Sequence, residues 1–308
     1  MSARKPRSRR ESEHKGLPYG RGVIGKHVFR VRERHVVEHL IPLMRRRAVG
    51  AAKLDLVLRG IALLPAHTGK REPGLVLPRY SWEQLHDLAR SAASLGSEPL
   101  ELDPSSEVVR LKRKWVGEQL VRLEQLKLVR RTERPGQRPK LVVLRDDGSG
   151  DPLDDPDGRP GNSYVTILGS LIGCGVLAGW GVAELSAYLA AMQGERLDRT
   201  AGKGTKRDPG GGSWYRPLGW FADTDRRYGS DARVRMPFSV PTLERGIARL
   251  ESADLLVRRR ILRDPVSHTR LRGPRNYYTN RFDSLGAPGD ILEPPEFERE
   301  LHRVDKEP

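Results

Sequence analysis

Cysteine is almost absent from this chain of 308 residues, in which Cys174 is the only one. One cysteine excludes an intrachain disulfide framework and a cysteine-based zinc site, and it suits a reducing compartment. The start of the chain, from Met1 to Arg34, is basic and has no apolar core, so we expect no signal peptide there. Both features predict a cytoplasmic protein. Cys174 lies in an apolar run, which favours a buried thiol over a nucleophile.

Apolar and aromatic residues are also scarce, at 37% and 6% of the chain. This content favours two small cores with polar tails and linkers over one large core. One long uncharged run, from Tyr164 to Ala183, has the length of a bilayer span. Its glycines and the break at Gly179-Trp180-Gly181 favour a buried strand and helix that lead into a second helix. We therefore expect no membrane partner, with a membrane span as the alternative.

Acidic residues are outnumbered by basic ones, 40 to 56, which gives a formal net charge of +16. Such an excess favours a polyanionic partner, because Lys and Arg neutralise phosphates and release condensed counterions. The alternative is a generally basic protein of the ribosomal kind. Only 12 of the basic residues are Lys and 44 are Arg, which prevails at forked contacts with phosphate and guanine. The codons of a GC-rich genome would produce the same bias.

Composition divides the chain into five parts. They are a basic flexible arm (1–34), a first domain (35–145), an acidic linker (146–162), a second domain (163–285) and a tail (286–308). The linker has six Asp, four Gly and three Pro, a composition typical of a connection between domains. A Gly-rich loop at residues 194–213 interrupts the second domain.

Hydrophobic periodicity predicts the same order of elements in both domains. In the first domain, we expect a helical stretch over 36–64 in two pieces, followed by a short helix that starts at Ser81, where Ser81 and Gln84 have the spacing of a capping box. A third helix is expected from Ser105 or Ser106 to about Leu126. A β-hairpin follows over 128–134 and 140–144. In the second domain, the corresponding helices are expected over 180–193, 217–228 and 241–253, and the hairpin over 255–263 and 270–279.

The two halves also share a sequence motif. Arg122-Leu123-Glu124 with Leu128-Val129 matches Arg249-Leu250-Glu251 with Leu255-Leu256 at the same spacing. In this register, the apolar residues Val116 and Leu120 fall on Leu243 and Ile247. Self-similarity of this kind indicates two copies of one supersecondary unit.

Each half has the order helix, helix, helix, strand, turn, strand, and the shared motif closes its third helix. This order resembles the winged helix family of DNA-binding proteins over 36–144 and 164–279. The second copy also resembles helix-turn-helix proteins of actinobacterial plasmids, phages and integrated elements. The residues concerned are Arg226-Arg227-Tyr228-Gly229, Thr242-Leu243-Glu244-Arg245-Gly246 and Leu250. Tandem copies in one chain further resemble plasmid replication initiators. The resemblance implies a fold that is mainly α with small β-hairpin wings (α+β), built as two tandem winged helix-turn-helix domains.

In that family the third helix enters the major groove, where all four base pairs differ. Thr242, Arg245 and Arg249 lie opposite the apolar face of the expected third helix, where they can face DNA. The alternative is that this face is only solvated and that Arg249 pairs with Glu244 or Glu251. Four crowded cations open the corresponding helix of the first copy, and they repel each other unless an anion is near. Hairpin arginines are expected at the DNA backbone or minor groove. The full expected set is Arg110, Lys112, Arg113, Lys114, Arg131, Arg138, Thr242, Arg245, Arg249, Arg259, Arg270 and Arg272.

Two short motifs point weakly to other chemistry. His35, Glu38 and His39 match the HxxEH pattern of zinc hydrolases, but the sequence offers no third ligand and no cavity-forming domain. Residues 202–205 resemble part of a phosphate loop, yet the leading Gly and the Ser or Thr after Lys203 are missing. We therefore expect no catalytic residue, metal or cofactor, and no enzyme activity. A zinc-dependent hydrolase is the remote alternative.

Together, these features predict a nucleoid-associated protein that binds double-stranded DNA sequence-specifically. We expect a transcriptional regulator. The alternative is a plasmid or phage replication initiator that binds origin repeats, so the transcription or replication machinery is a further expected partner.

Overall fold

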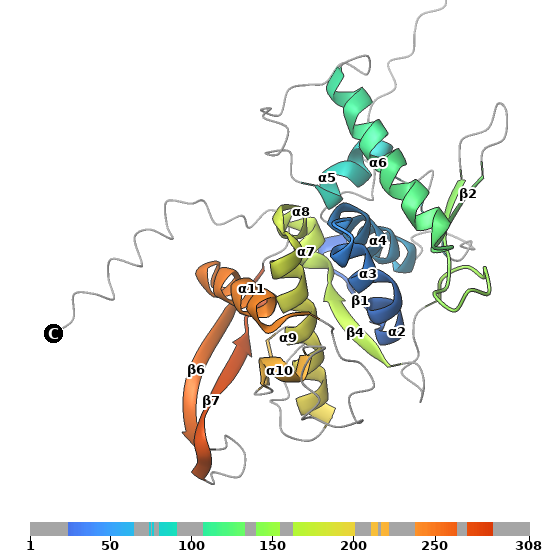
Figure 1. The fold of residues 1–308 in the computed structure, drawn as a ribbon. Helices are drawn as coiled ribbons and strands as arrows, with labels where there is room; N and C mark the ends of the chain where they lie inside the picture. The colour runs from blue at the N-terminus through green and yellow to red at the C-terminus, as the bar shows by residue number, and fades with distance from the viewer. Residues whose placement is uncertain are drawn as a thin grey trace, which may run out of the picture.

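Helices and small antiparallel sheets make up this mixed α/β protein, seen in a computed structural model (Figure 1). The structure describes residues 24–64, 74, 76, 80–90, 107–132, 140–154, 163–200, 211–214, 217–221, 238–263 and 270–285. Within these residues, no helix has both the length and the apolar character needed to cross a membrane.

The first half is built around α4 (Val49–Leu63), which is buried on every side. Every residue of this helix from Ala51 to Ala62 is buried. A helical run precedes it, made of α2 (Glu33–His35), the π-helix η1 (Val36–Leu40) and α3 (Ile41–Arg45). The sequence predicted the two helical pieces, but it predicted that only one face of α4 is buried. A helix that is buried on all sides has little amphipathic pattern, so periodicity could not reveal its full burial.

Two further helices and a hairpin complete this half. The helix α5 (Trp82–Ala89) begins at the predicted capping box, in which Ser81 and Gln84 each accept a hydrogen bond from the other's backbone N–H. The helix α6 (Glu107–Gln125) buries Val116, Leu120 and Leu123. It leads into β2 (Val129–Thr132), which pairs with β3 (Lys140–Val143).

The second half follows the same plan. It begins with β4 (Tyr164–Leu168), α7 (Gly169–Gly173) and α8 (Val176–Gly179), so the uncharged run forms a buried strand and short helices, as predicted. Cys174, at the end of α7, is half-buried, and burial raises the pKa of its thiol. The remaining elements are α9 (Val182–Thr200), β5 (Ser213–Trp214), α10 (Leu218–Phe221), α11 (Val240–Ser252), β6 (Leu256–Arg263), β7 (Arg270–Asn280) and a 3-10 turn at Phe282–Ser284.

The last strand of each hairpin also hydrogen-bonds a segment that follows the first helix of its half. In the second half the order is β5, β7, β6, so the short strand that follows the first helix pairs with the last strand. In the first half, Gly74 and Val76 take the place of β5. The Val76 N–H donates to the Leu141 carbonyl of β3 at 2.9 Å, and the Val143 N–H donates to the Gly74 carbonyl at 2.9 Å. The sequence predicted the hairpins but neither β5 nor the contacts of Gly74 and Val76 with β3.

The shared motif forms the same turn in both halves. After α6, Lys127 has a φ of 56°, and the Leu128 N–H donates to the Leu123 carbonyl at 2.9 Å. After α11, Asp254 has a φ of 52°, and the Leu255 N–H donates to the Leu250 carbonyl at 2.9 Å. This geometry closes a helix by satisfying its last carbonyls. The same local structure therefore occurs at matching places in the two halves.

A strand from the expected basic arm joins the two halves. The strand β1 (Val28–Arg32) pairs antiparallel with β4 of the second half, with Val28 opposite Leu168 and Arg32 opposite Tyr164. The prediction of a flexible arm up to Arg34 is therefore wrong for its last part. The pattern of the strand accounts for the difference, because Phe29 and Val31 alternate with exposed or half-exposed residues and bury their side chains.

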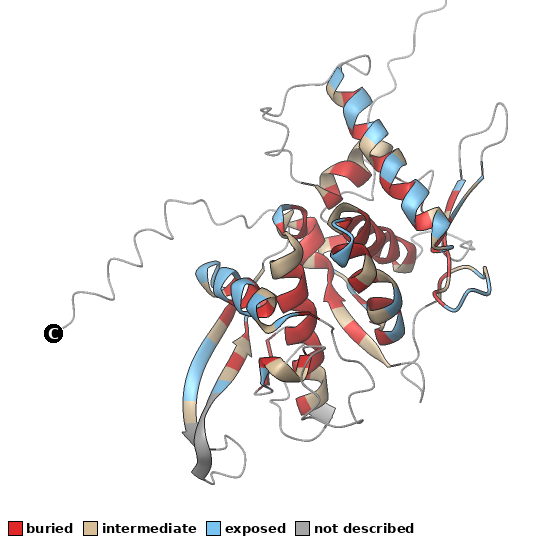
Figure 2. Ribbon diagram, viewed as in Figure 1, coloured by how far each residue is buried: buried red, intermediate tan, exposed pale blue. Residues whose placement is uncertain are grey.

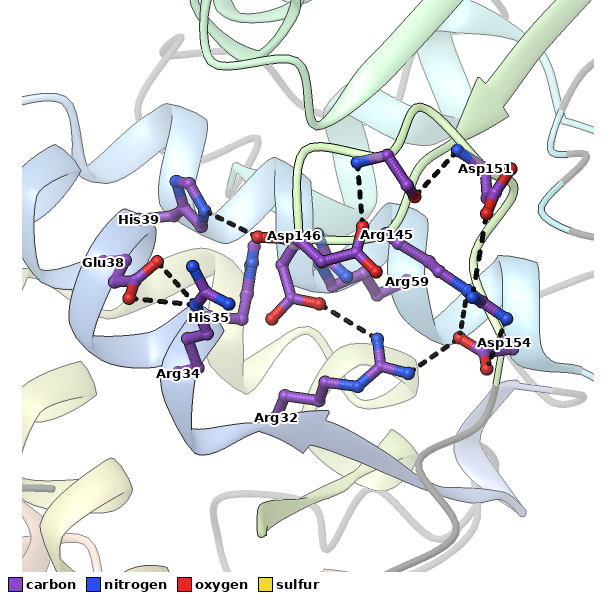
Figure 3. A network of polar contacts seen from close by, with 12 residues as sticks. Arg32, Arg34, His35, Glu38, His39, Arg59, Arg145, Asp146, Asp151 and Asp154 are labelled. Atoms are coloured by element: carbon purple, nitrogen blue, oxygen red, sulfur yellow. Dashed lines mark hydrogen bonds and ion pairs between the residues drawn. The ribbon is translucent and has the colours of Figure 1, made fainter. Parts of the chain in front are cut away.

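The start of the expected linker is also bound to this strand. The Arg32 guanidinium donates to Asp146 at 2.9 Å and to Asp154 at 2.8 Å, and Asp154 also accepts from Arg145 (Figure 3). Leu153 is buried. Residues 146–154 therefore form a turn that is anchored at both ends and exposed between them, where a linker was expected, while residues 155–162 lie outside the described part.

One apolar core extends through both halves, in place of the two small cores that were expected. Buried polar contacts cross the same boundary. The Lys53 ammonium of α4 donates to the carbonyls of Ala178 at 2.7 Å and Trp180 at 3.0 Å, and Glu33 accepts hydrogen bonds from Gln193 and Arg196 of α9. Such contacts hold α4 against the end of α8, and α2 against α9.

The helix α9 is longer than predicted. It was expected to end at Gln193, before a Gly-rich loop, but it continues to Thr200. Gly194 lies within the helix, and the Trp214 ring packs on it so closely that a Cβ there would lie 2.9 Å from the ring. Of the expected loop, residues 201–210 lie outside the described part.

Candidate nucleic-acid interface

The helix α11 separates an apolar face from a basic one. Ser239 caps its start by accepting from the Thr242 N–H at 3.4 Å, and Leu243, Ile247 and Leu250 are buried. Gly246 lies directly on α9, where a Cβ would clash with the Ala183 carbonyl oxygen. This contact fixes the helix, and its outer face is exposed (Figure 2). The exposed residues are Pro241, Glu244, Arg245, Ala248, Arg249 and Ser252.

Arg245 is held by its own helix. Its Nε donates to the Pro241 carbonyl at 3.3 Å, and its Nη2 lies 3.5 Å from the Thr242 hydroxyl. Thr242 is half-buried, and its hydroxyl also lies 2.8 Å from that of Ser239. Arg245 therefore lies on the outer face of α11, and the contacts of its side chain with the described residues are all within its own helix.

Arg249 is anchored to a neighbouring helix. Its side chain is 65% exposed, but Nη1 forms an ion pair with Glu184 of α9. Its partner is therefore not Glu244 or Glu251, the two partners considered from the sequence. Burial of Glu184 alone opposes ionisation, but the hydrogen bond from Arg249 and the backbone N–H of Gly181 outweigh it and lower the pKa of this carboxyl. Glu184 is thus ionised at neutral pH and holds the arginine in place.

The crowded cations at the start of α6 prove to be spread over different faces. Lys112 is buried, and its ammonium donates to Asp87 of α5 at 2.8 Å, so it does not face outward as expected. Arg110 pairs with Glu107 at 2.6 Å and Arg113 with Glu83 at 2.5 Å, and both are exposed. Lys114 is exposed as well. The carboxylates explain how so many cations tolerate one another within a single turn.

The register of the repeat aligns α11 with the later part of α6, and not with the cations at the start of α6. The helix α6 has 19 residues and α11 has 13, and the extra residues lie at the start of α6. In the register of the shared motif, Arg122 corresponds to Arg249 and Glu118 corresponds to Arg245. Arg122 is exposed, and it donates to Gln119 at 3.1 Å. Sequence reasoning overlooked Arg122 as a candidate, although it belongs to the repeated Arg-Leu-Glu motif.

The hairpin arginines alternate between two faces. Arg131 pairs with Glu124 of α6 at 3.4 Å, and in the second half Arg258 pairs with Glu251 of α11 at 2.9 Å. Both pairs have the same place in the repeat. They identify the face of each hairpin that lies toward its helix.

Arg259 lies on the other face of the second hairpin. Arg258 opposes Tyr278, whose ring stacks on the buried Trp214 with a centroid distance of 4.1 Å, whereas Arg259 opposes Tyr277. Directly opposed residues share a face, and neighbours along a strand alternate. Arg259 therefore points away from the α11 side, and the exposed Arg260, which was not among the expected residues, points toward it.

Three expected residues cannot be placed by their side chains. Arg138 lies outside the described residues. Arg270 and Arg272 belong to β7, in which Arg270 pairs with Arg263 of β6, but only the backbone is described there. The motif at residues 226–229 also lies outside the described part.

The histidines of the HxxEH motif make structural contacts (Figure 3). His35 is fully buried, with Nε2 2.6 Å from Asp55, and Asp55 also accepts from the buried Arg59. His39 lies 3.5 Å from the Asp146 carbonyl, and Glu38 pairs with Arg34. Within the described residues, no group of three or more His, Cys, Asp or Glu side chains could hold a metal ion.

The His35–Asp55–Arg59 cluster has strongly shifted acidities. Burial alone disfavours an ionised Asp55, but Arg59 and His35 outweigh it and lower its pKa to about 2. Burial and the charge of Arg59 lower the pKa of His35, which is therefore neutral at pH 7. The cluster links the helix of residues 33–45 to the centre of α4.

Comparison with known proteins adds no guide to this interface, because no family model, no curated sequence and no solved structure matches the chain.

Proposed function

We propose that this protein binds double-stranded DNA sequence-specifically through two winged helix-turn-helix units. The first comprises α4, α5, α6 and the β2–β3 hairpin, and the second α9, α10, α11 and the β6–β7 hairpin. The observation that supports this most is the repeated order of elements, with a C-terminal hairpin whose last strand hydrogen-bonds a segment after the first helix, and the same turn after the third helix. In winged helix proteins, that third helix enters the major groove.

The surface chemistry of the third helices supports the same function. Both α6 and α11 expose an outer face with arginines, and the two hairpins add further arginines beside it. Arg presents a planar fork of donors that matches the two acceptors of a guanine edge or the oxygens of a phosphate. Figure 1 shows α6 and the β6–β7 hairpin at opposite ends of the molecule, so the two units offer separate contact surfaces.

A salt series tests the binding itself. We expect fluorescence anisotropy with a selected duplex to show log K falling by several units per log unit of salt, at about 0.9 per phosphate neutralised. The formal charge of +16 is the physical reason. A flat dependence, or failure to retain any duplex from a random pool, would reject DNA binding.

We further propose that the binding serves transcriptional regulation. A map of bound genomic sites checks this purpose separately from binding. Single sites at scattered promoters would support a regulator, whereas clustered repeats at one origin would show a replication initiator instead.

A further inference from the structure

Glu184 occupies a position that a solvated surface carboxylate would not. It lies in the first turn of α9, and its side chain is 11% exposed. Its two oxygens have different donors. Oε2 accepts from the N–H of Gly181, the residue that precedes α9, at 3.0 Å, and Oε1 accepts from Nη1 of Arg249. Because the backbone holds one oxygen, the other is a fixed acceptor for the arginine.

The backbone on the arginine side is fixed as well. Gly246 packs against the Ala183 carbonyl, next to Glu184 in the sequence, and it lies on α11 less than one turn before Arg249. The base of the Arg249 side chain and its tip are therefore both positioned by the first turn of α9. One guanidinium nitrogen is engaged, while the side chain as a whole is 65% exposed on the outer face of α11.

The first half shows what this position looks like without such an anchor. Arg122, the counterpart of Arg249, donates to the neutral side chain of Gln119 on its own helix at 3.1 Å. Arg245 likewise has contacts with its own helix. Arg249 thus differs from both arginines, because its partner is ionised, largely buried and located on another element.

We propose that Glu184 is a positioning residue, which holds the guanidinium of Arg249 in a fixed orientation so that its remaining N–H groups discriminate between base edges. This inference rests on the proposed DNA binding. A fixed donor fork loses less conformational entropy on binding than a mobile one, and it favours the duplex whose acceptors match its orientation. A carboxylate near the interface also repels phosphates, so it adds sequence discrimination while lowering affinity for DNA in general.

The test compares Glu184→Gln with wild type on two duplexes, one selected by the wild-type protein from a random pool and one of scrambled sequence. The two donors reach two different oxygens of Glu184, and Gln has a carbonyl oxygen at only one of these positions and an NH2 donor at the other, so one of the two hydrogen bonds is lost. We expect affinity for the selected duplex to fall roughly tenfold, the size of a lost charged hydrogen bond, while affinity for the scrambled duplex stays the same or rises. A folding defect would reduce both affinities together.

Two further variants complete the design. Glu244→Gln removes the same charge from the exposed side of α11 and is expected to shift both affinities by one common small factor. Glu184→Asp keeps the charge but is one methylene shorter, so it is expected to lose discrimination without a gain on scrambled DNA. Equal losses for Glu184→Gln with thermal unfolding that matches wild type, equal gains or no change would each overturn the inference, and if Glu184→Gln unfolds, full discrimination by Glu184→Asp overturns it. If wild type selects no duplex at all, the proposed function itself fails.

Discussion

At the scale of single residues, the buried cluster of His35, Asp55 and Arg59 makes the fold sensitive to acid. Asp55 has a lowered pKa in the folded protein, so its contribution to stability is present above the unfolded value near 4 and is lost as pH falls toward about 2. His35 also has a lowered pKa, so below about pH 6.5 the unfolded chain binds a proton that the folded protein does not. Both groups therefore weaken the fold as the solution becomes more acidic.

We expect the free energy of unfolding to be lower at pH 5.5 than at pH 7.5. The difference should shrink in His35→Gln, which cannot take up a proton, although this variant is less stable at both pH values. Denaturant titrations followed by circular dichroism measure it, at constant ionic strength. An unchanged pH difference in the variant would show that His35 does not titrate as its burial requires.

At the scale of elements, two glycines on the third helices are expected to respond in opposite directions. Gly246→Ala would place a Cβ against the Ala183 carbonyl oxygen, too close for any real contact, and force α11 away from α9. Gly117→Ala on α6 meets no atom within 4 Å. We expect the first to destabilise by about 1–3 kcal/mol, as overpacking does. The second should stabilise by about 0.5–1 kcal/mol, because Ala loses less entropy in a helix than Gly.

Thermal unfolding of the two variants, recorded beside wild type, checks this pair. Gly117→Ala serves as the control for the intrinsic effect of the substitution in a helix. A stabilising Gly246→Ala would mean that α11 does not rest on the backbone of α9, and it would undermine the placement of Arg249.

Elements with one-sided patterns could be predicted from the sequence, and the others could not. The helix α11 has regularly spaced apolar residues between a cap and a turn, so its bounds were nearly right. The strand β1 was missed because it is short and lies in a basic segment, and its partner β4 belongs to the other half of the chain. No local pattern encodes a pairing over that distance.

The candidate site was predictable to a similar degree. Arg245 and Arg249 were placed on the outer face because they lie opposite Leu243, Ile247 and Leu250. Lys112 was misplaced although its spacing from Val109 and Val116 puts it on the buried side of α6, so the charge outweighed the periodicity in that inference. The Glu184 pair could not be foreseen, because it depends on how α9 and α11 cross.

At the scale of the whole molecule, the two halves are joined as one body. The β1–β4 pair, the buried Lys53 and the contacts of Glu33 with Gln193 and Arg196 all cross between them. Unfolding one half would expose the charged or polar groups of these contacts together with apolar surface of the other. We therefore expect the described part of the chain to unfold cooperatively, in contrast to two domains on a free linker.

Tryptophans in each half can report this. Trp82 and Trp115 lie in the first half, and Trp180, Trp214 and Trp220 lie in the second. Replacing either set by Phe leaves fluorescence that follows only the other half. With variants of matched stability, we expect the denaturation midpoints of the two halves to coincide. Two separate midpoints would show that the halves fold independently.

Arg245→Ala, measured on selected and scrambled duplexes, tests most directly whether α11 reads the sequence of a DNA duplex, as we propose. A bidentate contact between Arg and guanine discriminates by about 1–3 kcal/mol, so the variant should bind the selected duplex roughly tenfold or more weakly. Its affinity for the scrambled duplex should change much less, provided that its thermal unfolding matches wild type. Equal losses on both duplexes would contradict sequence reading by this helix.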